Sequence, residues 1–474
     1  DDFGEWFGND NGSLLWHFPL PAEAAALGVE AVQARIPGNR DDDRVFPTSR
    51  TLERFNDPHT ANHLTSACAP EIYRDTALGL GFAGDAFVCE PVHNLVRRAK
   101  LTREGVSFAA RRAPGERERE FLSSSDSWFR PVEVRTGTDG ALWVVDLHRF
   151  VVEHPRWIPP ERLQMLDVRA GADGGRIYRI RRRDAKPVAL PRLTGLAPEA
   201  LVQRLGSANG PLRDLAHREL LELPGTAWRR AVGGVKALAG EGGSPAVRAQ
   251  ALSLLAAKDD LPGPLLESAL RSGHPGLVTV ALGLVPADAR TARRTGLVPA
   301  SLHAEPAIAF HRALAWARGD AASMAPLVRA LAAQPDAPWI RNAAVAAARR
   351  HPKPILEALA DHPALLGPGS VLLPELLTAW DASRQADALE RALALAERLA
   401  SREGDPLRLL PAWLAARSLK TASPTLESTL ARWRQTLTPS LAASLDRADL
   451  PETARVAAAR RHPKPILEAL ADHP

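Results

Sequence analysis

The stretch RPVEVRTGTDGALWVVD, residues 130–146, has the pattern of a β-hairpin. Two runs rich in β-branched and aromatic residues flank Asp139-Gly140, a dipeptide that favours a tight turn between antiparallel strands. The second run is apolar and ends on Asp146. This is the local pattern of a propeller blade, in which an inner strand ends in a polar residue. Many hairpins share the pattern, so the stretch alone predicts two strands and leaves the β architecture open.

Similar signals occur through the first part of the chain, to about residue 188. Short strands are predicted at residues 6–8, 14–18, 85–90, 93–97 and 175–180. The Asn11-Gly12 turn separates the first two of them. Several short strands with loops between them are typical of a sandwich, a barrel or a propeller.

The pattern changes from about Leu193, where Ala and Leu dominate and apolar residues take helical spacing. Proline suits the first turn of a helix, because the N–H it lacks would be unpaired there anyway. It recurs about every 30 to 35 residues, which is the period of two-helix repeats, at Pro211, Pro245, Pro275, Pro306 and Pro338. The sequence therefore predicts a multidomain fold, β then α, with domains at residues 1–188 and 189–474, the second an α-solenoid.

The segment VAAARRHPKPILEALADHP occurs twice, at residues 345–363 and 456–474. Its two prolines predict a helix that ends near Arg350 and a partner helix from Ile355 to Asp361. His351 and His362 are expected to be surface residues, since a metal site needs three or four converging ligands. A recent duplication and a joining error in an assembled gene both explain the identity of the copies.

Composition argues against two classes of partner. The chain has 474 residues, and 45% of them are hydrophobic, so it can bury more than one core. The formal net charge is +5 and acids are spread along the chain, so the arginines at 176–183 are interpreted as a solvated face and no nucleic-acid partner is predicted. No run of about 18 apolar residues occurs, so no transmembrane segment is predicted.

The only cysteines are Cys68 and Cys89. Their spacing leaves two possibilities open, a disulfide in an exported protein or two buried free thiols. No CxxC or CxxCH motif is present, so the sequence excludes a zinc ribbon and a c-type haem attachment within this chain.

Five segments of the first part resemble a known family. They are WFGNDNGSLLWHF, FNDPHTANHLTSACAPEIYRD, GDAFVCEPVHNLVRR, GADGGRIYRI and the long block DSWFRPVEVRTGTDGALWVVDLHRFVVEHPRWIPPE. Together they resemble a family described as membrane-bound dehydrogenases. Its members join a propeller related to quinoprotein glucose/sorbosone dehydrogenases, a HEAT-repeat solenoid and a C-terminal c-type cytochrome domain. The likeness is detailed over residues 1–185 and covers residues 190–474 by repeat type only.

The resemblance implies a propeller of about six blades, of which residues 1–188 would hold only the last part. It implies a periplasmic or extracellular protein, with a disulfide between Cys68 and Cys89. Pyrroloquinoline quinone and calcium would serve an intact parent, and haem c would belong to a C-terminal domain absent from this sequence. The family's catalytic histidine would precede Asp1, so we expect this chain to be inactive. Any signal peptide is expected to be removed or to lie outside the sequence.

Four residues are candidates for binding such a cofactor. Arg130 could pair with quinone carboxylates, because guanidinium binds carboxylates bidentately. Glu90 and His93 lie where one strand gives way to the next and could ligate a metal or hold substrate. Asp146 ends an expected inner strand and could line a channel. The ordinary alternatives are a strand-end cap for Asp146 and a structural ion pair for Arg130.

Two further residues are candidates for catalysis. His63 could accept a proton near neutral pH, and Asp126 could orient such a base. The ordinary alternative for His63 is a hydrogen bond to a loop carbonyl.

Two functions from different classes follow. The first is a quinoprotein-like sugar or alcohol dehydrogenase, with the solenoid docking a protein partner and the propeller channel holding a small substrate. The second is a non-catalytic propeller–solenoid scaffold that binds proteins or glycans.

Overall fold

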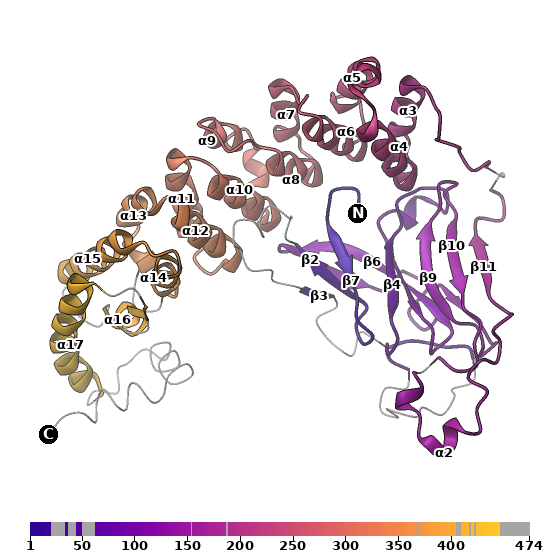
Figure 1. Cartoon of the computed structure of the whole chain (residues 1–474), viewed down its shortest axis with the longest axis horizontal. Coiled ribbons are helices and arrows are strands. Elements are labelled where there is room, and N and C mark those ends of the chain that lie inside the picture. The colour runs from indigo at the N-terminus through magenta and orange to yellow at the C-terminus, as the bar shows by residue number, and fades with distance from the viewer. Residues whose placement is uncertain are drawn as a thin grey trace. The chain divides into compact units, whose positions relative to one another are not determined.

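The computed structural model describes residues 1–19, 34–36, 44–49, 62–152, 154–185, 188–366, 370–403, 409–416, 419–420 and 423–445. Strands come first and helices follow, as the sequence predicts (Figure 1). The chain divides into two compact units. Unit 1 holds the described strands and the helices through α8, and unit 2 holds α9 and the helices from α11 onward.

The described strands form three antiparallel sheets. The first sheet contains β1 (Trp6–Gly8), β2 (Leu15–Phe18) and β3 (Ala34–Ile36). The central sheet contains β4 (Cys68–Ile72), β5 (Ala86–Glu90), β6 (Leu95–Glu104) and β7 (Ser107–Arg111), with β8 (Leu122–Ser123) pairing with β6. The third sheet contains β9 (Pro131–Thr136), β10 (Leu142–Asp146) and β11 (Arg176–Ile180).

Strand β5, in the central sheet, is buried on both faces. Successive residues of a strand point to opposite faces, and β5 is apolar at both sets of positions. Ala86 and Val88 pack with residues of the first sheet, whereas Phe87 and Cys89 pack with residues of the third. The central sheet therefore lies between the other two, which explains why β5 reads as a continuous apolar run.

The hairpin at 130–146 is confirmed as β9 and β10. Gly140 has φ +76°, a conformation that favours glycine in the connecting turn. A Cβ atom there would lie 2.5 Å from the Cβ atom of Ala77. The Tyr73 hydroxyl donates a 2.6 Å hydrogen bond to the Gly140 carbonyl oxygen, so the turn is also tied to the central sheet.

Helices occupy most of the chain after β11. Unit 1 contains α2 (Pro160–Leu163), which lies between β10 and β11, and then, after β11, α3 (Pro198–Leu205), α4 (Gly210–Glu222), α5 (Gly225–Ala239), α6 (Pro245–Ala257), α7 (Gly263–Leu270) and α8 (Pro275–Gly283). Unit 2 contains α9 (Thr291–Thr295), α11 (Met324–Ala333), α12 (Pro338–Arg350), α13 (Pro352–Ala360), α14 (Leu372–Ala382), α15 (Ala386–Glu403), α16 (Leu410–Ala416) and α17 (Pro424–Leu445). The segments given to the two units meet within α10 (Pro306–Arg318).

The recurring prolines lie where the sequence places them, at the first or second residue of α4, α6, α8, α10 and α12. In unit 1, α3 packs against α4 and α5, and α6 packs against the same two helices; in unit 2, α11, α12 and α13 pack against one another. This is the contact pattern of stacked helical hairpins. No described helix is both long and apolar enough to cross a bilayer.

The first copy of the duplicated segment forms the end of α12, which closes at Arg350 as predicted, and the whole of α13, which begins at Pro352 rather than at the predicted Ile355. The Nε2 atom of His351 lies 3.0 Å from the carbonyl oxygen of Gly319, so this histidine joins two parts of unit 2. The second copy, residues 456–474, lies outside the described residues.

Candidate functional site

Glu90 and His93 form a buried pair at the turn between β5 and β6. The Glu90 carboxylate accepts hydrogen bonds from the backbone N–H groups of Thr65 (3.1 Å) and Ser66 (3.0 Å), and from the Ser66 hydroxyl (2.5 Å). His93 Nδ1 lies 3.2 Å from Glu90, and its Nε2 accepts a bond from the N–H of Asn62. Nδ1 therefore carries the ring proton and donates a hydrogen bond to Glu90. Through these hydrogen bonds, Glu90 and His93 hold residues 62–66 against the turn between β5 and β6.

Arg130 and Asp146 lie close to the same turn. The Arg130 guanidinium donates hydrogen bonds to the carbonyl oxygens of Pro91 (2.9 Å), Arg149 (2.8 Å) and Phe150 (2.7 Å). Oδ1 of Asp146 accepts bonds from the backbone N–H groups of Arg130 and His148, both at 2.8 Å. The structure thus brings four of the nominated residues to one end of the β-sheets and gives each of them backbone partners.

These four residues do not fit a quinone and a calcium ion as they stand. Quinone carboxylates would have to displace three carbonyl groups from Arg130, which is buried. A cation at Glu90 would face the N–H and O–H donors that already occupy its oxygens, whereas calcium needs several free oxygen ligands. Within the described ranges, no group of three or more His, Cys, Asp or Glu side chains could hold a metal ion.

The end of β10 carries a histidine that the sequence analysis missed. His148 has φ +50°, and its Nε2 lies 3.6 Å from Oδ2 of Asp126. Its ring contacts Trp128, with ring centroids 5.7 Å apart. A Cβ atom at Gly174 would lie 2.1 Å from Nδ1 of His148, so only glycine leaves room for this ring. The sequence offers a weak signal, a histidine two residues after an apolar strand.

Two buried polar atoms at this end of β10 have no hydrogen-bond partner among the residues that the structure describes. They are Nδ1 of His148 and Oδ2 of Asp146. The Arg176 guanidinium lies 4.0 Å from Oδ2 of Asp146, beyond hydrogen-bond distance. Such atoms are costly to bury, so they mark this place as a candidate for ligand contact. His63 forms an isolated antiparallel bridge with Arg44 and directly follows Asn62, whose N–H bonds to His93.

The disulfide expected from the resemblance is not present. Cys68 and Cys89 are free thiols, although they oppose each other in the register of β4 and β5. The register shifts after Cys68, and its sulfur lies 3.7 Å from the carbonyl oxygen of Val132 on β9. Burial raises the pKa of the Cys68 thiol to about 12 and that of the Cys89 thiol well above its ordinary value. Both groups are therefore neutral thiols, which react slowly with oxidants.

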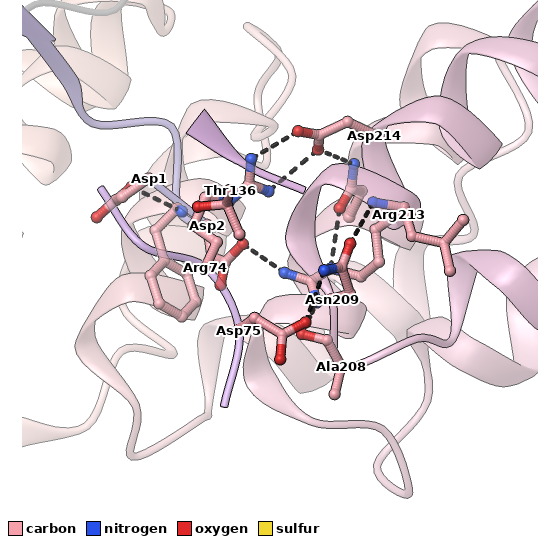
Figure 2. Close-up of polar contacts among 12 residues, drawn as sticks. Asp1, Asp2, Arg74, Asp75, Thr136, Ala208, Asn209, Arg213 and Asp214 are labelled. Atoms are coloured by element: carbon pink, nitrogen blue, oxygen red, sulfur yellow. Dashed lines mark hydrogen bonds and ion pairs between the residues drawn. The ribbon is translucent and has the colours of Figure 1, made fainter. Parts of the chain in front are cut away.

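A network of charged and polar residues, the sheet–helix junction, joins the sheets to α4 within unit 1 (Figure 2). Its members are Asp2, Arg74, Asp75, Asn209, Arg213 and Asp214. Arg74 binds Asp214 through two hydrogen bonds of 2.6 and 3.0 Å and binds Asp2 through a third of 2.6 Å. Bidentate pairs of this kind fix geometry as well as adding energy.

The junction residues at the start of α4 also have hydrogen-bond partners. Arg213 is buried, binds Asp2, and donates to the carbonyl oxygens of Ser207 and Ala208, each at 2.9 Å. The Asn209 side chain caps α4 by accepting from the N–H of Leu212, and its amide nitrogen donates to Asp75 at 2.6 Å. The sequence analysis did not find this network, since its members come from distant parts of the chain.

Comparison with known proteins adds one finding. A family model described as a domain of unknown function, DUF7133, matches residues 1–184. No curated protein and no solved structure matches the chain. The matched region contains the three sheets and ends before α3. Since the family description gives no activity, the function must be argued from the residues.

Proposed function

We propose that this chain is a protein-binding scaffold, and that β11 is the strand on which a partner docks. The observation that carries the proposal is the position and exposure of β11. It is the outer strand of the third sheet (Figure 1), and Ile177 is 64% and Tyr178 39% exposed. An edge strand with exposed apolar side chains offers unpaired backbone groups to an incoming strand.

The charges around β11 indicate the chemistry of its partner. Arg176 and Arg179 lie in the strand, and Arg181, Arg182 and Arg183 follow it directly. Asp139 pairs with Arg179 at 2.5 Å, and Asp184 pairs with Arg182 at 2.6 Å, so arginine exceeds the acids that pair with it here. A partner strand that alternates carboxylates with apolar residues would place its carboxylates on the face of Arg176 and its apolar side chains on the opposite face, which holds Ile177.

Two finer assignments belong to the same proposal. Three successive antiparallel sheets, the central one containing the meander β4–β5–β6–β7, support the blades of a propeller. Stacked helical hairpins that begin with proline support HEAT-like repeats, which would give protein partners a second surface. As the resemblance implies, we place the protein in the periplasm or outside the cell.

A blocked peptide of alternating Glu and Val is expected to bind the full chain, and Ile177→Glu is expected to weaken this binding about tenfold or more. The substitution removes an apolar contact and adds a repelling charge. The side chain is exposed, so folding should be unaffected. Leu80→Glu is the matched control. Leu80 is 84% exposed and lies in the connection between β4 and β5. Fluorescence anisotropy measures peptide binding by both variants. Equal weakening by the two substitutions would count against β11 as the docking strand.

A dehydrogenase is the second candidate, favoured by the unsatisfied atoms of Asp146 and His148 beside Asp126. If the scaffold proposal holds, adding pyrroloquinoline quinone, calcium and an electron-acceptor dye produces no sugar or alcohol oxidation. The measurement is dye reduction by the wild type and by His148→Ala. His217→Ala, on α4, is the control. Oxidation that is lost only in His148→Ala would replace the scaffold by an enzyme with its base at the end of β10.

A further inference from the structure

A cavity of about 780 Å³ in unit 1 lies between the first and central sheets. It is lined by parts of β3, β6 and β7 and by the segments that contain Phe46 and Arg117. Pockets of this size typically hold one small molecule.

Arginine dominates the walls of this cavity. Among the described residues that line it, six are arginines, at positions 35, 44, 97, 111, 112 and 117, and one is acidic, Glu104. Glu120 compensates Arg112 through hydrogen bonds of 2.8 and 3.2 Å. Like charges gathered around a partly enclosed space repel one another, so the arrangement favours an anion that neutralises them.

Arg111 and Arg117 carry the excess charge. Both side chains are exposed, and neither makes an ion pair or hydrogen bond within the part of the chain that the structure describes. Their guanidinium groups are therefore available to a ligand. Guanidinium groups offer planar, paired donors that match phosphate and carboxylate oxygens.

Other arginines at the cavity are held in place. The guanidinium carbons of Arg44 and Arg112 lie 5.3 and 4.8 Å from the centre of the Phe46 ring. Arg112 also donates a 2.5 Å hydrogen bond to the carbonyl oxygen of Arg44. Stacking and hydrogen bonding orient these cations before any ligand arrives, which lowers the entropy cost of binding. Phe46 and Phe108 add apolar surface to the same walls.

We propose that this cavity binds a small polyanion, a molecule with two or more phosphate or carboxylate groups beside an apolar part. The site is separate from β11, from the sheet–helix junction and from the Asp146–His148 end of β10. It extends the scaffold proposal by giving the β-sheet part a small-molecule ligand of its own.

The test uses calorimetric titration of the full chain with pyrophosphate and, separately, with citrate. Arg111→Gln/Arg117→Gln is expected to weaken binding of the preferred anion about tenfold or more. Arg218→Gln/Arg229→Gln is the control. It removes the same charge from exposed positions on α4 and α5 and should leave affinity unchanged. Both double variants should keep the wild-type melting temperature, because all four side chains are exposed.

Preference between the two anions distinguishes a phosphate ligand from a carboxylate ligand, and either supports the proposal. Absence of binding of both at millimolar concentration would overturn it, as would equal weakening by the two double variants. Asp41, Asp42 and Asp43 precede Arg44 in the sequence and lie outside the described residues. If anions bind only after these three are changed to Asn, the arginines serve an internal ion-pair network and the proposal fails.

Discussion

Arg213→Ala is expected to destabilise unit 1 by about 3 kcal/mol, the lower end of the cost of breaking a buried ion pair. The Arg213 side chain is 2% exposed, and the Asp2 side chain with which it pairs is 25% exposed. Truncation also removes the donors of the Ser207 and Ala208 carbonyl groups and the contact with Gln250. Each buried acceptor that loses its donor adds a desolvation cost.

Hydrogen exchange of peptides from β5 and α4 during urea unfolding measures this effect, because both elements belong to unit 1. Arg230→Ala is the matched control. Arg230 also makes two hydrogen bonds to one carboxylate, that of Glu199, but both side chains are more than half exposed. Exposed ion pairs contribute little to stability, so Arg230→Ala should barely change the urea midpoint of unit 1. Equal shifts in the two variants would show that the junction does not hold the sheets to α4.

The stability of the sheet–helix junction is also expected to depend on pH, through the carboxyl group of Asp214. Burial would raise its pKa, but the hydrogen bond and charge of Arg74 outweigh burial, and the pKa lies below its ordinary value. A lowered folded-state pKa gives stability that is present above the unfolded-state pKa and lost as the pH falls through the folded-state pKa. The junction should therefore weaken in acid, at a pH below the ordinary pKa of Asp.

Glu5→Gln is expected to cost about 3 kcal/mol at pH 7, the value of a pKa shift of this size. Glu5 lies 2.7 Å from Nε2 of His17, which is fully buried, and also pairs with Arg103. Burial would raise its pKa, but the bonds to His17 and Arg103 outweigh burial and lower the pKa from 4.5 to about 2. Nδ1 of His17 lies 3.1 Å from the Ser107 hydroxyl, so the cluster joins the first and central sheets.

The pH dependence identifies this effect. Stability from a lowered carboxyl pKa is complete above 4.5 and is lost as the pH falls toward about 2. Urea unfolding of wild type and variant should therefore differ most at pH 7, and by less than half as much near pH 3. Glu118→Gln, at an exposed position, should show no difference at either pH. A Glu5→Gln effect that is constant from pH 7 to pH 3 would show that its charge is not responsible.

Local sequence signals predicted those elements whose position depends on the backbone preference of a single residue. Gly140 requires a left-handed turn, and proline requires the start of a helix, so the hairpin and the helix starts could be placed from single positions. Strand β4 was missed because Pro70 interrupts its pattern and Ala69 takes φ +51°. Strand β6 runs past the predicted 93–97 to Glu104, since its second half is polar and paired with β7.

Contacts between distant residues could not be predicted in this way. Arg74 and Asp214 are 140 positions apart, and periodicity shows which face of an element is apolar without showing which charges meet across elements. Arg130 was nominated for a cofactor because guanidinium pairs with carboxylates, and Glu90 because it lies where one predicted strand gives way to the next. In the structure, both side chains instead form hydrogen bonds with backbone groups. Residue type alone does not reveal such bonds.

Hydrogen–deuterium exchange of β11 tests the scaffold proposal most directly. In the free chain, amides of β11 should exchange faster than those of β5, because an edge strand leaves part of its N–H groups without a strand partner. Saturation with the alternating Glu–Val peptide should then slow exchange at Arg176–Ile180 and leave β5 unchanged. Protection of β11 in the free chain, or bound peptide without added protection there, would contradict the proposal that a partner docks on this strand.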